Sequence, residues 1–331
     1  MRDRLLGQRN TIYGFCALWI VSFHIYKKLS IPTVPVVSHF LSIGNLSVDL
    51  FFFLSGLCLS LSAKKHRYSE NGWKPFFQRR LRRILLPYLL VGLPYYFWYA
   101  ICEGSGSLLH RALWFLANVS SASFWLKGLQ TTWYVYGILL FYLLFPLLYR
   151  FARKSTSIQK IILLLVFYGA AVLFSNLPIL RNSAIVWARL PIFTIGVFFG
   201  DRENDCRKAS ISLCILAAGI FSALGYLTSF RFFSVEENSL FVYKWLLFAP
   251  MTLSALFLLS AFGKRIRFLE WIGGLSLEIY LTHITALALL EHFDLIRRFG
   301  AWLYLLLPVY AVLTAWAVRL LTKLIRNRLE G

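Results

Sequence analysis

The chain has 331 residues, of which 59% are hydrophobic and only 15% are charged. A soluble domain rarely combines so high an apolar fraction with 11 Trp, 17 Tyr and 30 Phe, so the composition excludes an ordinary soluble protein. The net charge of +21 is compatible with binding to nucleic acid. The basic residues, however, gather in short loops between apolar segments, which favours a membrane surface and no nucleic-acid partner.

Ten apolar segments predict an all-α polytopic protein with about ten transmembrane helices in the lipid bilayer. The first segment follows Arg2, Arg4 and Arg9 and is predicted to be retained, because no small-residue cleavage site follows Ile25. The approximate bounds in chain order are 11–26, 43–63, 84–102, 132–151, 158–175, 184–200, 210–229, 240–262, 268–290 and 301–322.

The stretches between these segments are short. Residues 103–130 mix apolar and polar side chains, which indicates an interfacial or re-entrant segment. No hydrophilic stretch is long enough for a soluble domain, so residues 1–331 are predicted to form a single integral-membrane domain.

The positions of Lys and Arg orient the chain. Of the 35 basic residues, 24 lie at the two termini and in the loops after the second, fourth, sixth and eighth segments. Nine lie on the other side. Because cytoplasmic loops carry the excess of Lys and Arg, we predict a multi-pass protein of the inner (plasma) membrane with both termini in the cytoplasm.

Four ionisable side chains of the predicted spans share one depth, because this orientation places all four in the outer part of the membrane. They are His24, Asp49, Arg189 and His283, each from a different span. Placing an ionisable side chain in hydrocarbon costs free energy, and such residues in membrane proteins usually serve a function. We therefore predict that the four side chains line a shared polar cavity open to the outside.

Each of the four also has a structural interpretation. Either histidine can simply form a hydrogen bond with a neighbouring helix. Asp49 can pair with Arg189 as a buried bridge, or Arg189 can extend to the outer headgroups.

A basic cluster, Arg79, Arg80, Arg82 and Arg83, precedes the third span on the cytoplasmic side. It is either a phosphate clamp or a positive-inside signal that contacts anionic lipid. The five cysteines show no metal-like spacing and are interpreted as small buried hydrophobes, and no metal site is predicted.

Six segments, in order, resemble the acyltransferase-3 family of membrane enzymes that O-acylate bacterial cell-envelope sugars. The segments are GFCALWIVSFH, GNLSVDLFFFLSGLCLS, FFQRRLRRILLPY, TTWYVYGILLFYLLFPLL, ARLPIFTIGVFFGD and GGLSLEIYLTHI. The family's arginine motif fits best on Arg80 and Arg82. Its usual Arg or Lys eleven residues before the first-helix histidine is Tyr13 here, with Arg9 one turn earlier.

The resemblance implies a membrane O-acyltransferase that uses cytoplasmic acyl-CoA, with acetyl-CoA as the commonest donor. Arg9 and the basic cluster would hold this donor. His24 would act as general base and Asp49 would orient its ring. Trp133, Arg189 and His283 are assigned to binding the carbohydrate or glycolipid acceptor, with Arg189 or His283 also able to stabilise an oxyanion.

Other functions stay open at this stage. A transporter or flippase of lipid-linked sugars also needs a polar cavity among many helices. A structural membrane protein has no need for four ionisable groups at one depth. Transfer proceeds either directly or through a separate protein, and a homo-oligomer is compatible with the sequence.

Overall fold

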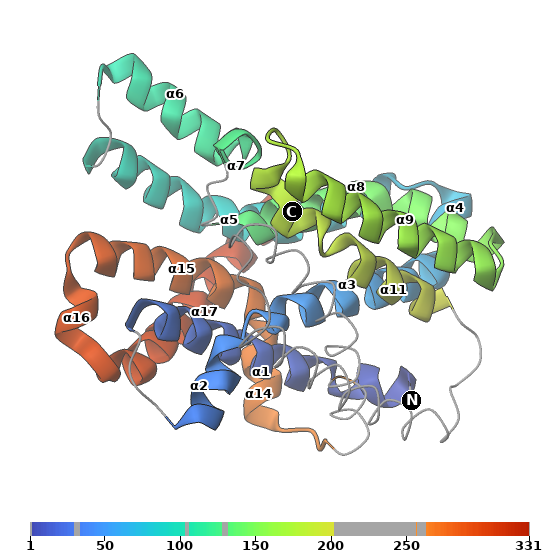
Figure 1. Ribbon diagram of the computed structural model, residues 1–331, viewed down its shortest axis with the longest axis horizontal. Helices are drawn as coiled ribbons and strands as arrows, with labels where there is room; N and C mark the ends of the chain where they lie inside the picture. The colour runs from blue at the N-terminus through green and yellow to red at the C-terminus, as the bar shows by residue number, and fades with distance from the viewer. Residues whose placement is uncertain are drawn as a thin grey trace. The chain divides into compact units, whose positions relative to one another are not determined.

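A computed structural model describes residues 2–29, 34–102, 106–127, 132–201, 256 and 263–330. Within these ranges the regular elements are helices and no strand occurs (Figure 1). The all-α prediction is therefore confirmed for this part of the chain. The predicted spans 210–229 and 240–262 lie outside the described residues, apart from Leu256.

In chain order the described helices are α1 (Arg2–Leu29), α2 (Pro35–Ser42), α3 (Leu46–His66), α4 (Tyr68–Asn71), α5 (Lys74–Cys102), α6 (Leu108–Val119), α7 (Ala122–Lys127), α8 (Trp133–Lys154), α9 (Ser157–Asn176), η1 (Arg181–Ser183), α10 (Ala184–Trp187), α11 (Leu190–Asp201), α14 (Arg267–Gly274), α15 (Ser276–His292), α16 (Leu295–Phe299), η2 (Gly300–Trp302) and α17 (Leu303–Glu330). The longer described helices cover the predicted apolar segments of this part of the chain, and the shorter helices α2, α4, α6, α7 and α16 lie outside those segments.

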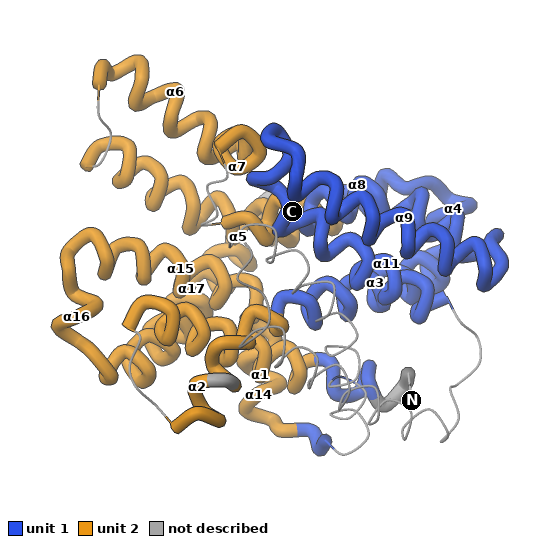
Figure 2. Tube along the Cα trace, viewed as in Figure 1, with its two compact units in different colours: residues 1–9, 48–77, 137–265 blue, residues 10–47, 78–136, 266–331 orange. Residues whose placement is uncertain are grey.

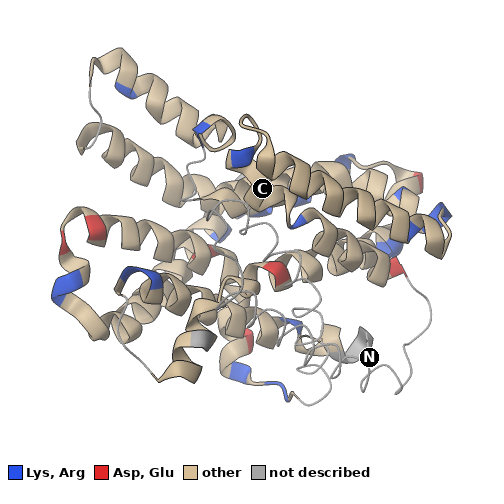
Figure 3. Ribbon diagram, in the orientation of Figure 1, with Lys and Arg blue, Asp and Glu red and all other residues tan. Residues whose placement is uncertain are grey.

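Six helical stretches in the described part are long and apolar enough to cross a membrane. They are Leu46–His66, Lys74–Cys102, Trp133–Lys154, Ser157–Asn176, Arg181–Asp201 and Leu295–Arg328. The bent pair α14 and α15 makes a seventh if it is counted as one span. Lys160 is the one charged residue of α9, and most of the helical ribbon in Figure 3 is uncharged (tan). Side chains of α9 such as Leu165 are exposed, as expected against lipid. The described part thus contains six candidate membrane spans, and the count of about ten stays a prediction.

Three predicted spans differ in shape from a single straight helix of the expected length. The third begins ten residues early, because α5 starts at Lys74 and so includes the basic cluster. Pro75 is tolerated there because the first helical turn needs no backbone donor. The sixth is interrupted by a turn at Ala188 and Arg189, and the ninth bends by 71° where α14 meets α15. Gly273 and Gly274 precede this bend and weaken the helix locally.

The described helices belong to two compact units, coloured separately in Figure 2. Unit 1 comprises residues 1–9, 48–77 and 137–265, and unit 2 comprises residues 10–47, 78–136 and 266–331. Each unit therefore joins segments that are far apart in the sequence.

Close backbone contact between α3 and α11 organises unit 1. A Cβ atom added to Gly196 would lie 2.2 Å from the Phe53 carbonyl oxygen, and one added to Gly56 would lie 2.3 Å from that of Phe193. Gly196 and Gly200 form a GxxxG pattern, which allows the backbones of membrane helices to approach closely. This contact brings the start of α11 alongside α3.

In unit 2 the corresponding contact joins α1 to α14. A Cβ atom at Gly14 would lie 2.0 Å from the Leu269 carbonyl oxygen, and one at Gly273 would lie 1.9 Å from that of Asn10. No larger side chain fits at either position without moving backbone. Because α15 follows α14 directly and packs along α17, the same contact sets the position of α15 relative to α1.

Candidate active site

Two of the four predicted intramembrane groups, His24 of α1 and His283 of α15, lie together in unit 2. Their ring centroids are 5.3 Å apart, with the rings inclined by 47°. His283 is fully buried, whereas His24 is partly exposed. These residues are 259 positions apart in the sequence, so the packing of α1 and α15 alone brings them together.

The hydrogen bond of His283 defines its tautomer. Its Nδ1 atom lies 2.8 Å from the carbonyl oxygen of Ile279, one turn earlier in α15. A carbonyl only accepts, so Nδ1 carries the proton and, in the neutral ring, Nε2 carries a lone pair. This buried Nε2 atom has no hydrogen-bond partner among the residues that the structure describes. His283 therefore offers an oriented, unoccupied acceptor beside His24.

Aromatic side chains connect this histidine pair to the start of α8. The Tyr280 ring lies 5.9 Å from the His283 ring and 5.2 Å from the Tyr134 ring, measured between centroids. The Tyr280 hydroxyl also accepts a hydrogen bond from the backbone N–H of Tyr134 at 3.3 Å. Trp133, the buried first residue of α8, is thus one residue away from this aromatic contact. The sequence analysis did not identify Tyr280, although its i, i+3 spacing from His283 indicates the same side of a helix.

A hydroxyl network fixes the beginning of α8 in unit 2. Thr132 donates to the Tyr136 hydroxyl at 2.7 Å, and Tyr136 donates to the Asn118 carbonyl at 3.0 Å. The hydroxyls of Tyr88 and Tyr96, both from α5, lie 2.9 Å from Tyr136 and 2.8 Å from Thr132 respectively. Buried hydroxyl groups are stabilised when they form hydrogen bonds with one another, so this network fixes the start of α8, which includes Trp133, relative to α5 and α6.

The other two predicted groups, Asp49 of α3 and Arg189, form an ion pair in unit 1. Arg189 Nε lies 3.1 Å from Asp49 Oδ1, and both side chains are almost fully buried. Arg189 also donates from Nη1 to the Ile185 carbonyl at 2.9 Å. Its position in the turn between α10 and α11 lets the guanidinium reach α3, and Asp49 stands in the first turn of α3, where a negative charge is favoured.

These contacts decide between some of the alternatives that the sequence left open. The ion pair is the buried bridge considered for Asp49 and Arg189, and with 1% of its surface exposed Arg189 does not extend to the headgroups. One oxygen of Asp49, Oδ2, has no hydrogen-bond partner within the described ranges. The predicted pairing of Asp49 with His24, and the cavity shared by all four groups, stay predictions.

The predicted donor-binding arginines lie on helices. Arg79, Arg82 and Arg83 are exposed on α5 and Arg80 is half-buried. Residues two apart on a helix do not face each other, so Arg80 and Arg82 point to different sides of α5. Arg9 of α1, in unit 1, lies with its Nη1 atom 3.9 Å from Cys58 Sγ of α3.

Another intramembrane ion pair was not predicted. Glu278 of α15 is buried and lies 3.3 Å from Arg319 of α17 in unit 2. Both are ionisable residues inside predicted spans, and this feature of the sequence could have identified them. Under the predicted orientation they lie toward the cytoplasm from His283. Among the residues that the structure describes, no group of three or more His, Cys, Asp or Glu side chains is arranged to hold a metal ion.

The profile of the acyltransferase-3 family, which describes an acyltransferase domain, matches residues 12–320 of this chain. No curated protein and no solved structure matches the chain. The family match covers nearly the whole sequence and agrees with the apolar helices described above. The chain therefore belongs to the acyltransferase-3 family of membrane acyltransferases.

Proposed function

We propose that this protein moves an acyl group, acetyl in the first instance, from cytoplasmic acyl-CoA to a hydroxyl of a cell-envelope sugar or lipid-linked glycan. Family membership supports acyl transfer in a membrane. The observation that carries the rest of the proposal is the pair of histidines in unit 2, with ring centroids 5.3 Å apart and a lone pair on His283 Nε2 that no described residue occupies.

His24 is the general base in this proposal. It takes the proton from the acceptor hydroxyl, whose oxygen attacks the thioester carbonyl carbon and forms a C–O bond. The tetrahedral intermediate then loses the C–S bond, and the CoA sulfur leaves with the proton that the imidazolium returns. Partial exposure suits His24 to this task, because the base has to meet a substrate that enters from outside the protein.

His283 holds the acceptor. With its proton fixed on Nδ1 by Ile279, the neutral ring presents Nε2 as a hydrogen-bond acceptor. A sugar with neighbouring hydroxyls can donate one to His283 and present the other to His24. Trp133 and Tyr134, at the buried start of α8, supply aromatic surface on which a sugar ring can pack, because Tyr134 reaches Tyr280 beside His283. Of the two residues predicted to stabilise the oxyanion, Arg189 keeps this role in the proposal, because the neutral His283 ring presents a lone pair at Nε2 and no proton.

The donor is bound on the cytoplasmic side. Arg79, Arg80, Arg82 and Arg83 place four guanidinium groups within five residues of α5, and guanidinium groups bind phosphate through charge-assisted hydrogen bonds. Because Arg80 and Arg82 point to different sides of the helix, they would contact two different phosphates of CoA. Arg9 adds a cation in the first turns of α1. The protein acts in the inner membrane with both termini in the cytoplasm, either alone or as a homo-oligomer.

The experiment that tests this function uses the purified protein in lipid vesicles, supplied with radiolabelled acetyl-CoA and an extract of cell-envelope glycans. The wild-type protein should transfer label to glycan. The His24→Ala variant should lose transfer by a factor on the order of a hundred or more, as expected for loss of a general base.

A matched control is His292→Ala, since His292 is a second histidine of α15, is exposed and contacts Trp98. It should transfer at the wild-type rate. Near-normal turnover by His24→Ala at saturating donor would remove His24 from the mechanism. A transporter or flippase of lipid-linked sugars would transport its substrate but leave acetyl-CoA unconsumed by the wild-type protein.

A further inference from the structure

A single side chain of α17 bridges the bend between α14 and α15 in unit 2. Arg319 donates from Nη1 to the Gly274 carbonyl at 2.8 Å, and the same nitrogen lies 3.3 Å from Glu278 Oε1. Gly274 is the last residue of α14, and Glu278 stands in the first turn of α15. One guanidinium group therefore holds both sides of the 71° bend.

The first turn of α15 has no side-chain cap from the residue that precedes it. Helix ends leave backbone groups without intrahelical partners, and a capping side chain usually satisfies some of them. Leu275 provides no such cap, and Gly274 has no side chain. The carboxylate of Glu278 is favoured near a helix N-terminus, but at 4% exposure it also needs a counter-charge. Arg319 supplies a hydrogen-bond donor and the counter-charge together.

The same first turn carries the group that orients His283. Glu278 directly precedes Ile279, whose carbonyl accepts the hydrogen bond of His283 Nδ1 at 2.8 Å. Thr282, next to His283, donates from its hydroxyl to the Glu278 carbonyl at 2.9 Å, and this hydroxyl lies 3.2 Å from the Ala311 carbonyl of α17. A movement of this turn is therefore passed directly to His283.

The bend lies between the two histidines of the proposed active site. The close contact of Gly14 with the Leu269 backbone fixes α14 against α1, which carries His24, whereas α15 carries His283. His283 lies nine residues beyond Gly274, or about 13.5 Å along the helix axis. A change of about 10° in the direction of α15 at the bend would move His283 by about 2 Å. Catalytic groups have to stay within about 0.5 Å of their productive positions, so the bend has to be rigid.

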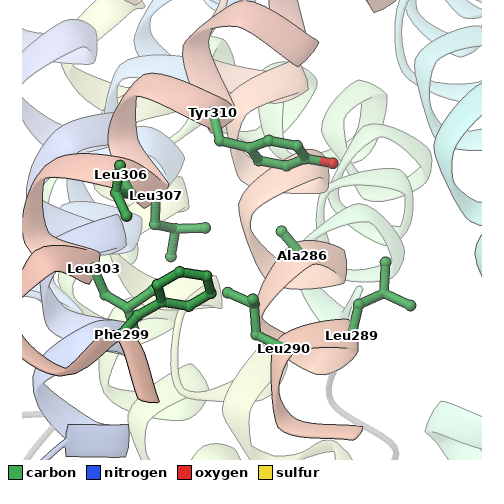
Figure 4. A pocket seen from close by; sticks show the side chains of 8 residues that line it. All are labelled: Ala286, Leu289, Leu290, Phe299, Leu303, Leu306, Leu307 and Tyr310. Atoms are coloured by element: carbon green, nitrogen blue, oxygen red, sulfur yellow. The ribbon is translucent and has the colours of Figure 1, made fainter. Parts of the chain in front are cut away.

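The second half of α15 borders an apolar groove of about 290 Å³ that it shares with α16 and α17 (Figure 4). The groove begins at Ala286, three residues beyond His283, and its lining is hydrocarbon apart from the Tyr310 hydroxyl. Because apolar contacts are not directional, the groove does little to fix the direction of α15. The hydrogen bonds of Thr282 and Arg319, on the other side of His283, therefore contribute more to it.

This ion pair also has a purely structural interpretation, in which it contributes to folding stability alone. Two features favour a positioning role. The shorter contact of Arg319 is with the Gly274 backbone at the bend, and charge balance does not require that contact. The Arg319 side chain is also 49% exposed, so its own charge does not depend on Glu278 for compensation.

We propose that Arg319 is a positioning residue for acyl transfer. By joining Gly274 to Glu278 it fixes the α14–α15 bend and thereby holds His283 at the distance from His24 at which one acceptor reaches both rings. The inference rests on the proposed acyl transfer and adds a residue outside the predicted catalytic, donor-binding and acceptor-binding sets. Arg319 acts through His283 and does not itself contact the substrate.

A double variant removes the bridge without leaving a buried charge. Arg319→Met with Glu278→Gln lacks both the donor to the Gly274 carbonyl and the carboxylate. Its thermal midpoint should lie close to that of Glu278→Gln alone, which keeps an oxygen that accepts from Arg319. In steady-state acyl transfer by the double variant, the KM for the acceptor should rise about tenfold, while the KM for acetyl-CoA stays unchanged.

The matched control is Lys323→Met, because Lys323 lies one turn further along α17 and is exposed. This variant removes the same charge and should behave like the wild type. Arg319→Lys keeps a cationic donor, and its KM for the acceptor should lie between those of the wild type and the double variant. An ion pair with a structural role alone would change the fraction of folded protein, which lowers the apparent kcat and leaves both KM values unchanged.

The rigidity of the bend is measured independently of activity. In a background without the five native cysteines, spin labels are attached at Phe268→Cys of α14 and His292→Cys at the end of α15, two exposed positions on opposite sides of the bend. Pulsed electron paramagnetic resonance gives the distribution of distances between the labels. We expect a narrow distribution with Lys323→Met and a broader or shifted one with Arg319→Met, Glu278→Gln.

The result that contradicts this inference differs from the one that contradicts the proposed function. An unchanged KM for the acceptor in the folded double variant, or an unchanged distance distribution, would overturn the positioning role although acyl transfer stands. If the wild-type protein acylates no glycan, the proposed function fails, and the spin-label distances alone decide whether Arg319 holds the bend.

Discussion

The imidazole rings of His24 and His283 lie 5.3 Å apart between centroids, and among the residues that the structure describes only the His283 ring has a hydrogen bond to the backbone. His283 is oriented by the Ile279 carbonyl, whereas His24 is partly exposed. This asymmetry assigns different tasks to the two rings, because a fixed acceptor positions a substrate and a ring at the surface of the site can exchange protons with it.

The His283→Asn substitution keeps the hydrogen bond that orients the side chain at position 283 but removes the Nε2 atom. The asparagine amide can still donate to the Ile279 carbonyl, but it has no atom in the place of Nε2. We expect a folded protein whose KM for the acceptor rises at least tenfold while kcat changes less, as measured by steady-state acyl transfer. His283→Ala, which removes both functions, serves as the comparison. A loss of kcat in His283→Asn as large as that in His24→Ala would instead make His283 the base.

Asp49→Asn should destabilise unit 1, because it leaves the buried Arg189 guanidinium without its counter-charge. Removal of one partner of a buried ion pair costs about 3 kcal/mol or more. The expected result is a lower thermal midpoint in detergent together with reduced transfer. The measurement is differential scanning fluorimetry on the purified variant.

The double variant Asp49→Leu, Arg189→Met distinguishes a structural role of this ion pair from a catalytic one. Replacing both charges by apolar side chains should restore most of the stability, since no buried charge is left unpaired. If transfer returns with stability, the pair only supports the fold. If stability returns and transfer does not, Asp49 or Arg189 takes part in the reaction.

The basic cluster of α5 should determine the affinity for the donor. Replacing Arg80 and Arg82 by Gln removes two charge-assisted contacts and should weaken binding of acetyl-CoA and of free CoA roughly a hundredfold, as measured by calorimetry. Arg79→Gln with Arg83→Gln removes the same charge from one face of the helix and should have a smaller effect. Unchanged donor affinity in a well-folded Arg80, Arg82 variant would leave the cluster with a role in topology alone.

The predicted orientation of the chain can be tested with cysteine labels. In a background without the five native cysteines, Lys64→Cys at the end of α3 and Lys127→Cys at the end of α7 place reporters at two exposed positions. A membrane-impermeant maleimide added to intact cells should label position 127 and not position 64. Labelling of both positions from the same side would contradict the orientation and the common depth of the four ionisable groups.

The sequence by itself determined the membrane helices, because long apolar runs and the alternation of basic loops are local properties of the chain. It also identified His24, Asp49, Arg189 and His283, since an ionisable residue within an apolar run is visible without any knowledge of packing. The order of six motifs was enough to indicate the acyltransferase-3 family, which the match over residues 12–320 confirms.

Only the tertiary structure decided which of these groups meet. Asp49 pairs with Arg189 because the glycines of α11 allow its backbone to approach α3 and because a turn interrupts the sixth segment at Arg189. His283 meets His24 because Gly14 and Gly273 bring α1 against α14, from which α15 departs at a bend of 71°. The ion pair between Glu278 and Arg319 and the groove beside Ala286 also result from the packing of distant helices. Such contacts depend on how distant helices pack, and an apolar sequence pattern fixes which residues are helical but not which helices become neighbours.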